Sequence, residues 1–422
     1  MPVTRRQLKL PWALQESTIR LILGIAAFAG AGVGLIIPFL TLTARNRGVS
    51  LAAIGVMASS YLFAQMLLQL PMGMLSDRIG RAGPIALGLV VEAAATAGFI
   101  FAETSWSFIL LRAIQGAGVA MVYPALRALI ADVTPSNRLG QAFAGYGAAF
   151  NAGLLFGPLL GGILAAPIGV NALFLAAAGV EVGVALASLV LLRDKGARHE
   201  RAEVSQIPIR ALIVRPLIGA FILSFSNQFQ MGLFSGIWSI YLADRGASDF
   251  LIGLSFTTYS IAYLIMAPMG GRQADSGKRW FRLLVSNLTL GCIMVSYGLL
   301  PSVLLILLMG LVEGAVTTVA QPSADAYLAS VADPRVMGRV QGMYATIGMA
   351  GAAISAFLGS ALYAIGHVVP FVTAGGVAWI LTFVAVYFIR QTEVRIEREG
   401  HAVQVSVAAE LELATPSDGP GR

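Results

Sequence analysis

Apolar stretches of 20 or more residues recur along almost the whole chain, and short polar segments separate them. Each stretch is long enough to cross about 30 Å of hydrocarbon. Only helices satisfy their own backbone polar groups in lipid over such lengths. The pattern therefore predicts twelve membrane-spanning helices, at about residues 18–44, 50–76, 83–102, 106–131, 139–165, 168–192, 215–243, 249–273, 280–300, 302–330, 338–364 and 367–390.

Composition supports a membrane protein. Of the 422 residues, 57% are hydrophobic and only 12% are charged, which is about half the charge of a soluble domain. The single cysteine, Cys292, lies inside the ninth span. We therefore expect no disulfide framework, no metal cluster and no cofactor.

The positive charges are distributed unevenly between the two sides of the predicted bundle. The loops on one side hold only Arg45, Arg47 and Arg245, and Arg112 and Arg127 lie within spans, whereas the other 23 of the 28 Lys and Arg belong to the opposite side. This asymmetry predicts that both termini are cytoplasmic. Anionic inner-leaflet lipid explains the net charge of +7 without a nucleic-acid partner.

The longest polar connection divides the spans six and six, and the two halves align without a gap at an offset of 198 residues. Gly73, Asp77 and Arg81 then correspond to Gly271, Asp275 and Arg279. We expect a cytoplasmic segment (1–17), an N-terminal bundle (18–192), a linker (193–214), a C-terminal bundle (215–390) and a polar, largely disordered tail (391–422). A parallel repeat of two six-helix bundles is typical of transporters that bind substrate between their halves.

Three motifs carry a resemblance to a known family: "GMLSDRIGRAG" from Gly73, "RAIQGAG" from Arg112 and "GLLFGPLLGG" from Gly153. With them, residues 18 to 390 resemble the major facilitator superfamily, and within it the twelve-helix drug:proton antiporters. The resemblance implies an all-α integral membrane fold, with two six-helix bundles related by a pseudo-two-fold axis. It also implies transport by alternating access.

In similar proteins the first motif is a signature loop between the second and third helices. The resemblance assigns a gating role to Gly73, Asp77, Arg78, Gly80 and Arg81, with Asp132 as the partner of Arg81. Ala82 stands where the family usually has a further basic residue. The alternative is an ordinary basic loop that sets topology.

The second motif places Arg112, Gln115 and Gly116 inside the fourth span. A buried arginine is costly, so we expect Arg112 to face the bundle interior and a partner. The alternative is that its side chain extends toward the membrane interface.

The third motif, with Gly153, Gly157, Pro158, Gly161 and Gly162, resembles the family's antiporter motif in the fifth helix. Its glycines at i, i+4 and i+8 form a smooth face, which we expect to slide against the eighth helix of the other half. The alternative is plain small-residue packing.

Proton coupling requires a group that can be neutral at one stage and charged at another. Burial in a low dielectric disfavours the charged form of a carboxyl group, which suits this role. The candidates are Glu313 in the tenth span, close to the midplane, and Glu92 and Glu181 in the third and sixth. In this superfamily the third and sixth helices belong to the outer, lipid-facing set, which favours Glu313.

The first span has no acid, unlike many drug antiporters, so substrate charge stays open. Large aromatic and amide side chains suit amphipathic or aromatic ligands. The candidates to line the substrate cavity are Gln65, Gln69, Gln115, Tyr123, Asn151, Asn227, Gln228, Gln230, Trp238, Tyr241, Tyr259, Tyr263, Glu313 and Gln321. The alternative for residues at span ends, such as Tyr241, is an anchor at the membrane interface.

The offset of 198 also places Arg127 opposite Asp325, at the cytoplasmic ends of the fourth and tenth spans. We expect these two side chains to meet as an inner gate when that side closes.

The sequence thus predicts a multi-pass protein of a bacterial plasma membrane, monomeric, that exports small amphipathic or aromatic compounds in exchange for protons. The alternatives are a proton-coupled importer, an exporter of a single metabolite or lysolipid, and a sensor or scaffold on the same fold. An enzyme is not expected, because the three His lie in loops or tails and no nucleophile–base grouping is present.

Overall fold

The computed structural model describes residues 17–135, 138–192, 214–274, 278–332 and 337–399. Twelve helices in this part are long and apolar enough to cross a membrane. The first half holds α1 (Ser17–Asn46), α2 (Leu51–Ile79), α3 (Ala82–Gly98), α4 (Ser105–Val133), α5 (Leu139–Ile168) and α6 (Val170–Leu191), with a short 3-10 turn η2 (Phe99–Phe101) after α3. The second half holds α7 (Arg215–Asp244), α8 (Asp249–Ala274), α9 (Arg279–Leu299), α10 (Val303–Val331), α11 (Met337–Ile365) and α12 (Val369–Glu399).

The predicted helices are confirmed, with boundaries that differ by a few residues at most ends. The largest difference is at α12, which continues to Glu399, so the boundary predicted at residue 390 falls inside this helix. The extension, "QTEVRIERE", is polar; a helix can continue beyond the hydrocarbon because its backbone groups stay paired in water as in lipid. Residues 400–422 and the linker residues 193–213 lie outside the described part.

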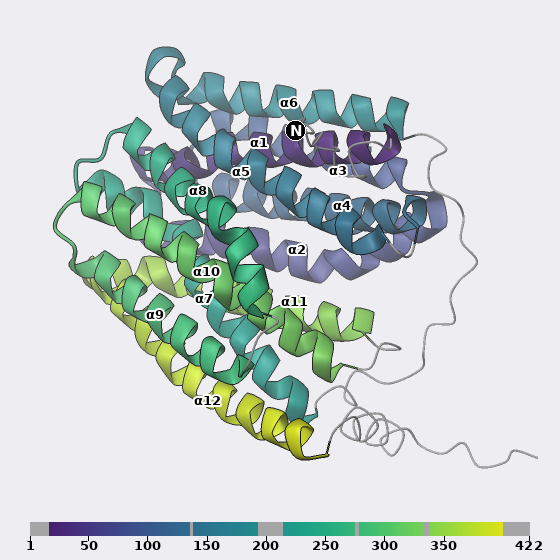
Figure 1. The fold of residues 1–422 in the computed structure, drawn as a ribbon. Coiled ribbons are helices and arrows are strands. Elements are labelled where there is room, and N and C mark those ends of the chain that lie inside the picture. Colours follow the sequence, from purple (N-terminus) through teal and green to yellow (C-terminus); the bar gives the residue numbers. More distant parts are fainter. Residues whose placement is uncertain (1–16, 136–137, 193–213, 275–277, 333–336, 400–422) are drawn as a thin grey trace, which may run out of the picture.

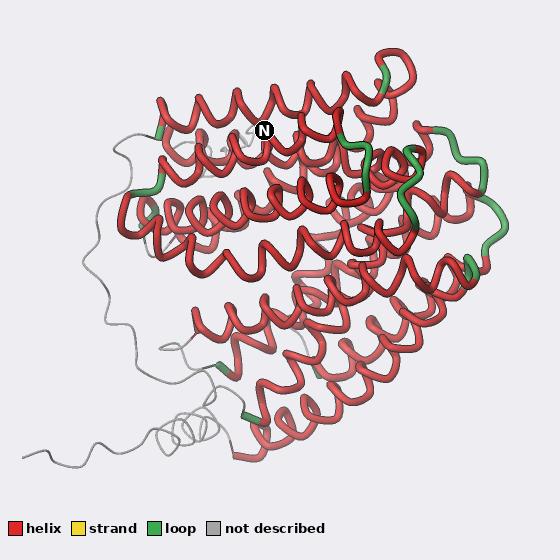
Figure 2. The backbone as a smooth tube through the Cα atoms, turned by 180° about the vertical axis from the view of Figure 1, so that it is seen from behind, coloured by secondary structure: helices red, strands yellow, loops and turns green. Residues whose placement is uncertain are grey.

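The helices form two bundles that lie side by side (Figure 1). Within the first bundle α1 packs on α5 and α2 on α4, and within the second α7 packs on α11 and α8 on α10. The halves meet mainly through α2 with α11 and α5 with α8. Seen from behind, nearly all of the described chain is helix with short connections (Figure 2).

We call the end of the molecule where α1 begins and α12 finishes the terminal end (Figure 1). At the opposite end, α1 to α2 and α7 to α8 are joined by equivalent tight turns, in which Gly48 and Gly246 have φ values of 81° and 77°. Such positive φ values favour glycine, because it has no Cβ. The predicted 198-residue repeat thus extends to the conformation of the turns.

Candidate functional site

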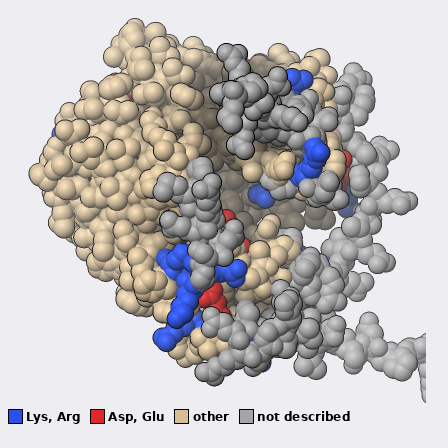
Figure 3. Space-filling view, in the orientation of Figure 1, with Lys and Arg blue, Asp and Glu red and all other residues tan. Residues whose placement is uncertain are grey.

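A cavity of about 680 Å³ lies between the two halves. Its walls come mainly from α5 of the first half and from α7, α8 and α10 of the second. The lining extends toward the terminal end, as far as Ala144 near the start of α5 and Asp325 near the end of α10. In the space-filling view the surface between the halves is hollowed on this side (Figure 3).

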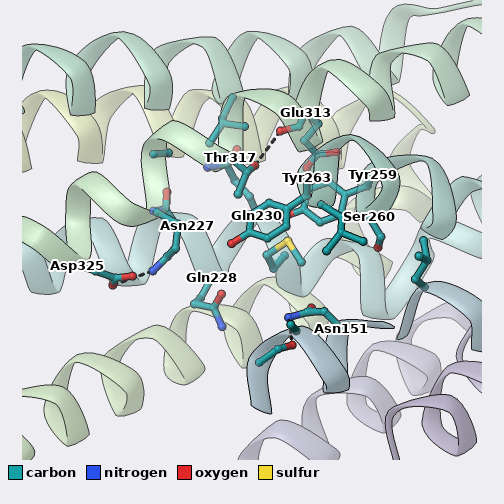
Figure 4. Close-up of a pocket in the computed structure, with 18 of the residues that line it drawn as sticks. Asn151, Asn227, Gln228, Gln230, Tyr259, Ser260, Tyr263, Glu313, Thr317 and Asp325 are labelled. Carbon is teal, nitrogen blue, oxygen red and sulfur yellow. Dashed lines mark hydrogen bonds between the residues drawn. The ribbon is translucent and has the colours of Figure 1, made fainter. Parts of the chain in front are cut away.

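Glu313 is one of the two acids that α10 presents at this cavity, and only 8% of it is exposed. Its carboxylate accepts a hydrogen bond of 2.6 Å from the hydroxyl of Tyr297 on α9. One turn further along α10, the hydroxyl of Thr317 donates to the backbone carbonyl of Glu313 at 2.8 Å (Figure 4). The carboxyl group is therefore bonded to one phenol and is largely removed from solvent.

Aromatic and amide side chains surround this acid. The rings of Tyr259 and Tyr263 on α8 stack with their centres 6.2 Å apart. Asn151 and Gln228 approach the same space from α5 and α7 (Figure 4). Nearer the terminal end, Asp325 accepts a hydrogen bond of 3.0 Å from the Gln321 amide. The described lining thus holds two acids and no Lys or Arg.

Most of the side chains predicted for the cavity do line it: Asn151, Asn227, Gln228, Gln230, Tyr259, Tyr263, Glu313 and Gln321. Ser260 and Thr317 also line it and were missed, although each lies within one helical turn of a predicted residue, a spacing that could have found them.

Six predicted residues do not line the cavity: Gln65, Gln69, Gln115, Tyr123, Trp238 and Tyr241. Trp238 is 4% exposed and donates to Ser255 at 2.8 Å within the core of the second half. Tyr123 packs edge-on against Phe150. Their helices carry apolar residues on every side, so sequence alone did not show which face meets the other half.

The other two predicted acids lie away from the cavity, in a polar cluster inside the first half. Glu92 and Glu181 are 5% and 1% exposed, and Glu92 interacts electrostatically with both Glu181 and Arg112. Two buried acids and one arginine thus lie close together inside the first half, away from the central cavity.

Arg112 belongs to the same cluster, which agrees with the expectation that it faces the bundle interior. Its guanidinium donates to the Gln115 side chain at 2.8 Å and lies 4.0 Å from the centre of the Tyr61 ring. The Gln115 amide in turn donates to Thr96 at 2.8 Å. Gly116, in the same motif, packs directly on the backbone of Tyr61, where a side chain would not fit.

At the signature loop, Arg81 joins the ends of α2 and α4. Its Nε lies 3.0 Å from the Asp132 carboxylate, as the resemblance implied, and its Nη1 also pairs with Asp77. Burial lowers the pKa of Arg81, but the hydrogen bonds that Arg81 donates to Asp77 and Asp132, with the attraction of their charges, outweigh burial and leave the pKa raised. Gly80 ends α2 with a φ of 93°, which explains a glycine at that position.

The remaining loop residues take ordinary positions. Arg78 is exposed, and Gly73 faces the ring of Pro124 on α4, where a Cβ would lie 3.5 Å away.

The prediction for the glycines of the fifth helix was wrong. Gly153, Gly157 and Gly161, the i, i+4 and i+8 positions, face α1 of the same half: a Cβ at Gly157 would lie 2.8 Å from the Ala31 carbonyl oxygen. Gly162 instead faces α8, where a Cβ would lie 2.8 Å from the Asp249 carbonyl oxygen. The three-glycine face therefore allows close packing within the first half, and Pro158 and Gly162 meet α8.

At the opposite end the halves are joined by direct bonds. Arg45 of α1 and Asp244 of α7 form an ion pair of 2.6 Å, and Tyr363 of α11 donates to the same carboxylate at 2.8 Å. Two further bonds follow the 198-residue repeat: Ser59 donates to the Ala353 carbonyl, and Thr257 to the Leu155 carbonyl, each at 2.9 Å. The cavity is thus closed at this end and extends toward the terminal end.

The predicted gate pair is separated in this conformation. Arg127 lies 5.6 Å from the centre of the Phe143 ring, and Asp325 is bonded to Gln321. Separation is what an inner gate would show with the terminal end open, so the pairing stays a prediction.

Comparison with known proteins identifies the family. The model of the Major Facilitator Superfamily matches the chain twice, at residues 22–226 and 220–414. The chain therefore belongs to this superfamily, and it is a multi-pass membrane transporter. Each match covers one half of the fold, and the two overlap within α7.

Individual relatives are distant. An uncharacterised MFS-type transporter of Methanocaldococcus jannaschii is 28% identical over 64% of this chain and 69% of its own length. The quinolone resistance protein NorA of Staphylococcus aureus is 26% identical over 51% of this chain and 55% of its own length. A solved POT family transporter matches 88% of this chain and 96% of its own with a TM-score of 0.73 and 15% identity, and the human organic anion transporter MFSD10 matches 87% and 98% with a TM-score of 0.64 and 19% identity. At these identities the solved structures show the fold alone.

Proposed function

We propose that this transporter exports small amphipathic or aromatic compounds from a bacterial cell in exchange for protons. The observation that carries the proposal is Glu313, a nearly buried carboxyl group in the wall of the inter-half cavity, held by Tyr297 and close to the stacked rings of Tyr259 and Tyr263. A proton and a substrate can compete for such a group, which is the chemical requirement for antiport.

The lining also favours a substrate class. Stacked tyrosines attract flat aromatic ligands and can hold a cation over their faces. Two acids without a described Lys or Arg in the lining favour a positively charged or weakly basic compound. Because α1 has no acid, the second half supplies the negative charge of the cavity in this proposal.

The direction of transport follows from orientation. The excess of Lys and Arg toward the terminal end supports a cytoplasmic location for this end in the plasma membrane. The cavity would then be open to the cytoplasm, where an exporter loads its substrate. The similarity to NorA, named for quinolone resistance, makes a fluoroquinolone a suitable first compound.

The test uses the full chain, alone, in proteoliposomes with an imposed pH gradient. Antiport predicts that a fluorescent aromatic weak base or fluoroquinolone accumulates in the acidic lumen against its own gradient, beyond the accumulation in protein-free liposomes. Accumulation only when compound and protons enter together from an acidic exterior would indicate the importer instead. Transport of the compound at a rate independent of the pH gradient would exclude proton coupling.

A further inference from the structure

A second hollow lies on the outer surface of the second half, away from the central cavity. It is a groove of about 560 Å³ between α9 and α12, with Trp280 and Leu284 on one side and Phe383, Val386, Tyr387 and Arg390 on the other. Phe383 and Tyr387 are 58% and 60% exposed. Since α9 and α12 pack on α7 and α10 with their other faces, the groove faces the bilayer.

The groove has an apolar part and a charged end. Leu284 and Phe383 lie deeper in the membrane-spanning part, whereas Trp280 and Arg390 lie toward the terminal end. The Arg390 guanidinium lies 5.0 Å from the centre of the Trp280 ring, which holds it beside the groove. A Trp at this depth matches the aromatic belt found at headgroup level.

Positive charge predominates around this end. Lys278, Arg279 and Arg282 lie at the beginning of α9, and Arg390 and Arg395 lie near the end of α12. Glu393, which accepts a hydrogen bond from the Trp280 backbone amide, is the acid among the side chains described at this corner. Blue side chains gather over this region of the second half in Figure 3. A ligand here therefore gains from a negative head and an apolar tail.

We propose that this groove binds an anionic phospholipid from the leaflet at the terminal end. The phosphate lies at Arg390, and one acyl chain follows Leu284 and Phe383. Basic pockets between membrane helices bind anionic headgroups in this way. The site needs only the membrane-spanning fold, so it is independent of the transport function proposed above.

The test counts lipids bound to the purified full chain by native mass spectrometry, with phosphatidylglycerol and phosphatidylcholine as the probes. We expect the first phosphatidylglycerol to bind at least about tenfold more tightly than phosphatidylcholine, and Arg390→Gln to reduce that preference about fivefold, a typical effect of one basic residue near a headgroup. Arg20→Gln removes an exposed charge at the same end but from the first half. This control should change the preference for phosphatidylglycerol less than twofold.

A second variant tests the apolar part of the groove. Leu284→Trp fills the apolar part without changing any charge, so this variant should also weaken the binding of the first phosphatidylglycerol molecule. An unchanged melting temperature would show that the variant is folded. Equal losses in Arg390→Gln and Arg20→Gln would mean diffuse attraction and overturn the site. A dimer peak that Leu284→Trp abolishes would assign the groove to a second copy of the chain and likewise overturn it.

Discussion

The guanidinium of Arg45 lies 2.6 Å from the carboxylate of Asp244, and this pair joins the first half to the second at the end opposite the chain termini. Both side chains are 37% exposed, so the pair is a solvated one. Tyr363 adds a hydrogen bond to the same carboxylate. The export that we propose requires access from both sides in turn, so these bonds are expected to break when this end opens.

Weakening this pair should shift the molecule toward the state that is open at the opposite end. An exposed ion pair contributes about 0.2–1 kcal/mol, so Arg45→Gln should change the ratio of the two states by up to about fivefold. Asp244→Asn should have the larger effect, because it also weakens the bond from Tyr363.

The measurement is a distance distribution between spin labels at positions 103 and 301, which are exposed and equivalent in the 198-residue repeat, in a Cys292→Ser background. A longer distance should gain weight in both variants and return to the original distribution in Arg45→Asp combined with Asp244→Arg. Identical distributions in all four proteins would show that the pair does not control closure.

Stability should depend on which way each glycine of α5 points. Gly157→Ala places a Cβ 2.8 Å from backbone atoms of α1, and such overpacking costs about 1–3 kcal/mol. We expect a lower melting temperature in detergent for Gly157→Ala, whereas Gly183→Ala, with nothing within 4 Å of its Cβ, should melt like the original protein. Gly162→Ala disturbs the contact with α8 and should reduce transport more than it reduces stability. Equal melting temperatures for Gly157→Ala and Gly183→Ala would contradict this packing.

Arg47 should be a structural arginine. Its guanidinium donates to the carbonyls of Phe99, Ile100 and Ala102 at 2.7–3.1 Å, and Arg245 does the same at Gly298 and Leu300 in the other half. Since hydrogen bonds from charged groups contribute about 1.5–3 kcal/mol, Arg47→Ala should lower the melting temperature of the purified protein. Arg20→Ala removes an exposed arginine and serves as the control; a fall of the same size in both would count against a specific role.

Arg127 and Asp325 should meet only when the terminal end closes. Arg127→Asp and Asp325→Arg should each abolish most transport, because each places two like charges at the gate. The double variant restores the pair with its charges exchanged, and should recover a substantial part of the activity in proteoliposomes. If both single variants fail and the double variant gives no recovery, the pair is not a gate.

The sequence predicted the helices well, because a membrane requires a minimum apolar length and every span meets it. It also placed Glu313 correctly at the cavity, since a midplane acid in lipid must face a polar interior. Rotation about a helix axis was harder to predict. Gly157 and Gly162 lie on one helix, yet the first packs on α1 and the second on α8, and nothing in an apolar, glycine-rich helix distinguishes these two faces.

The sequence predicted which residues are buried charges in the first half, but not that they form one polar cluster. Glu92, Arg112 and Glu181 stand out individually as buried charges, but their proximity depends on how α3, α4 and α6 pack together. Likewise, the ion pair of Arg45 and Asp244 joins residues 199 positions apart, and the repeat does not relate them to each other. Such contacts between halves follow from the conformation adopted, which a single sequence does not specify.

We propose that Glu313 exchanges a proton for the substrate, and proton release from membrane vesicles is the measurement that tests this exchange. Inside-out membrane vesicles are energised to an acidic lumen, and a pH-sensitive dye reports proton release on addition of a fluoroquinolone or an aromatic weak base. Glu313→Gln is compared with Glu92→Gln, Glu181→Gln and the exposed control Glu103→Gln. We predict compound-induced release in the original protein and in Glu103→Gln, and none in Glu313→Gln. Release that persists in Glu313→Gln and disappears in Glu92→Gln or Glu181→Gln would contradict this role of Glu313 and place proton coupling in the first half.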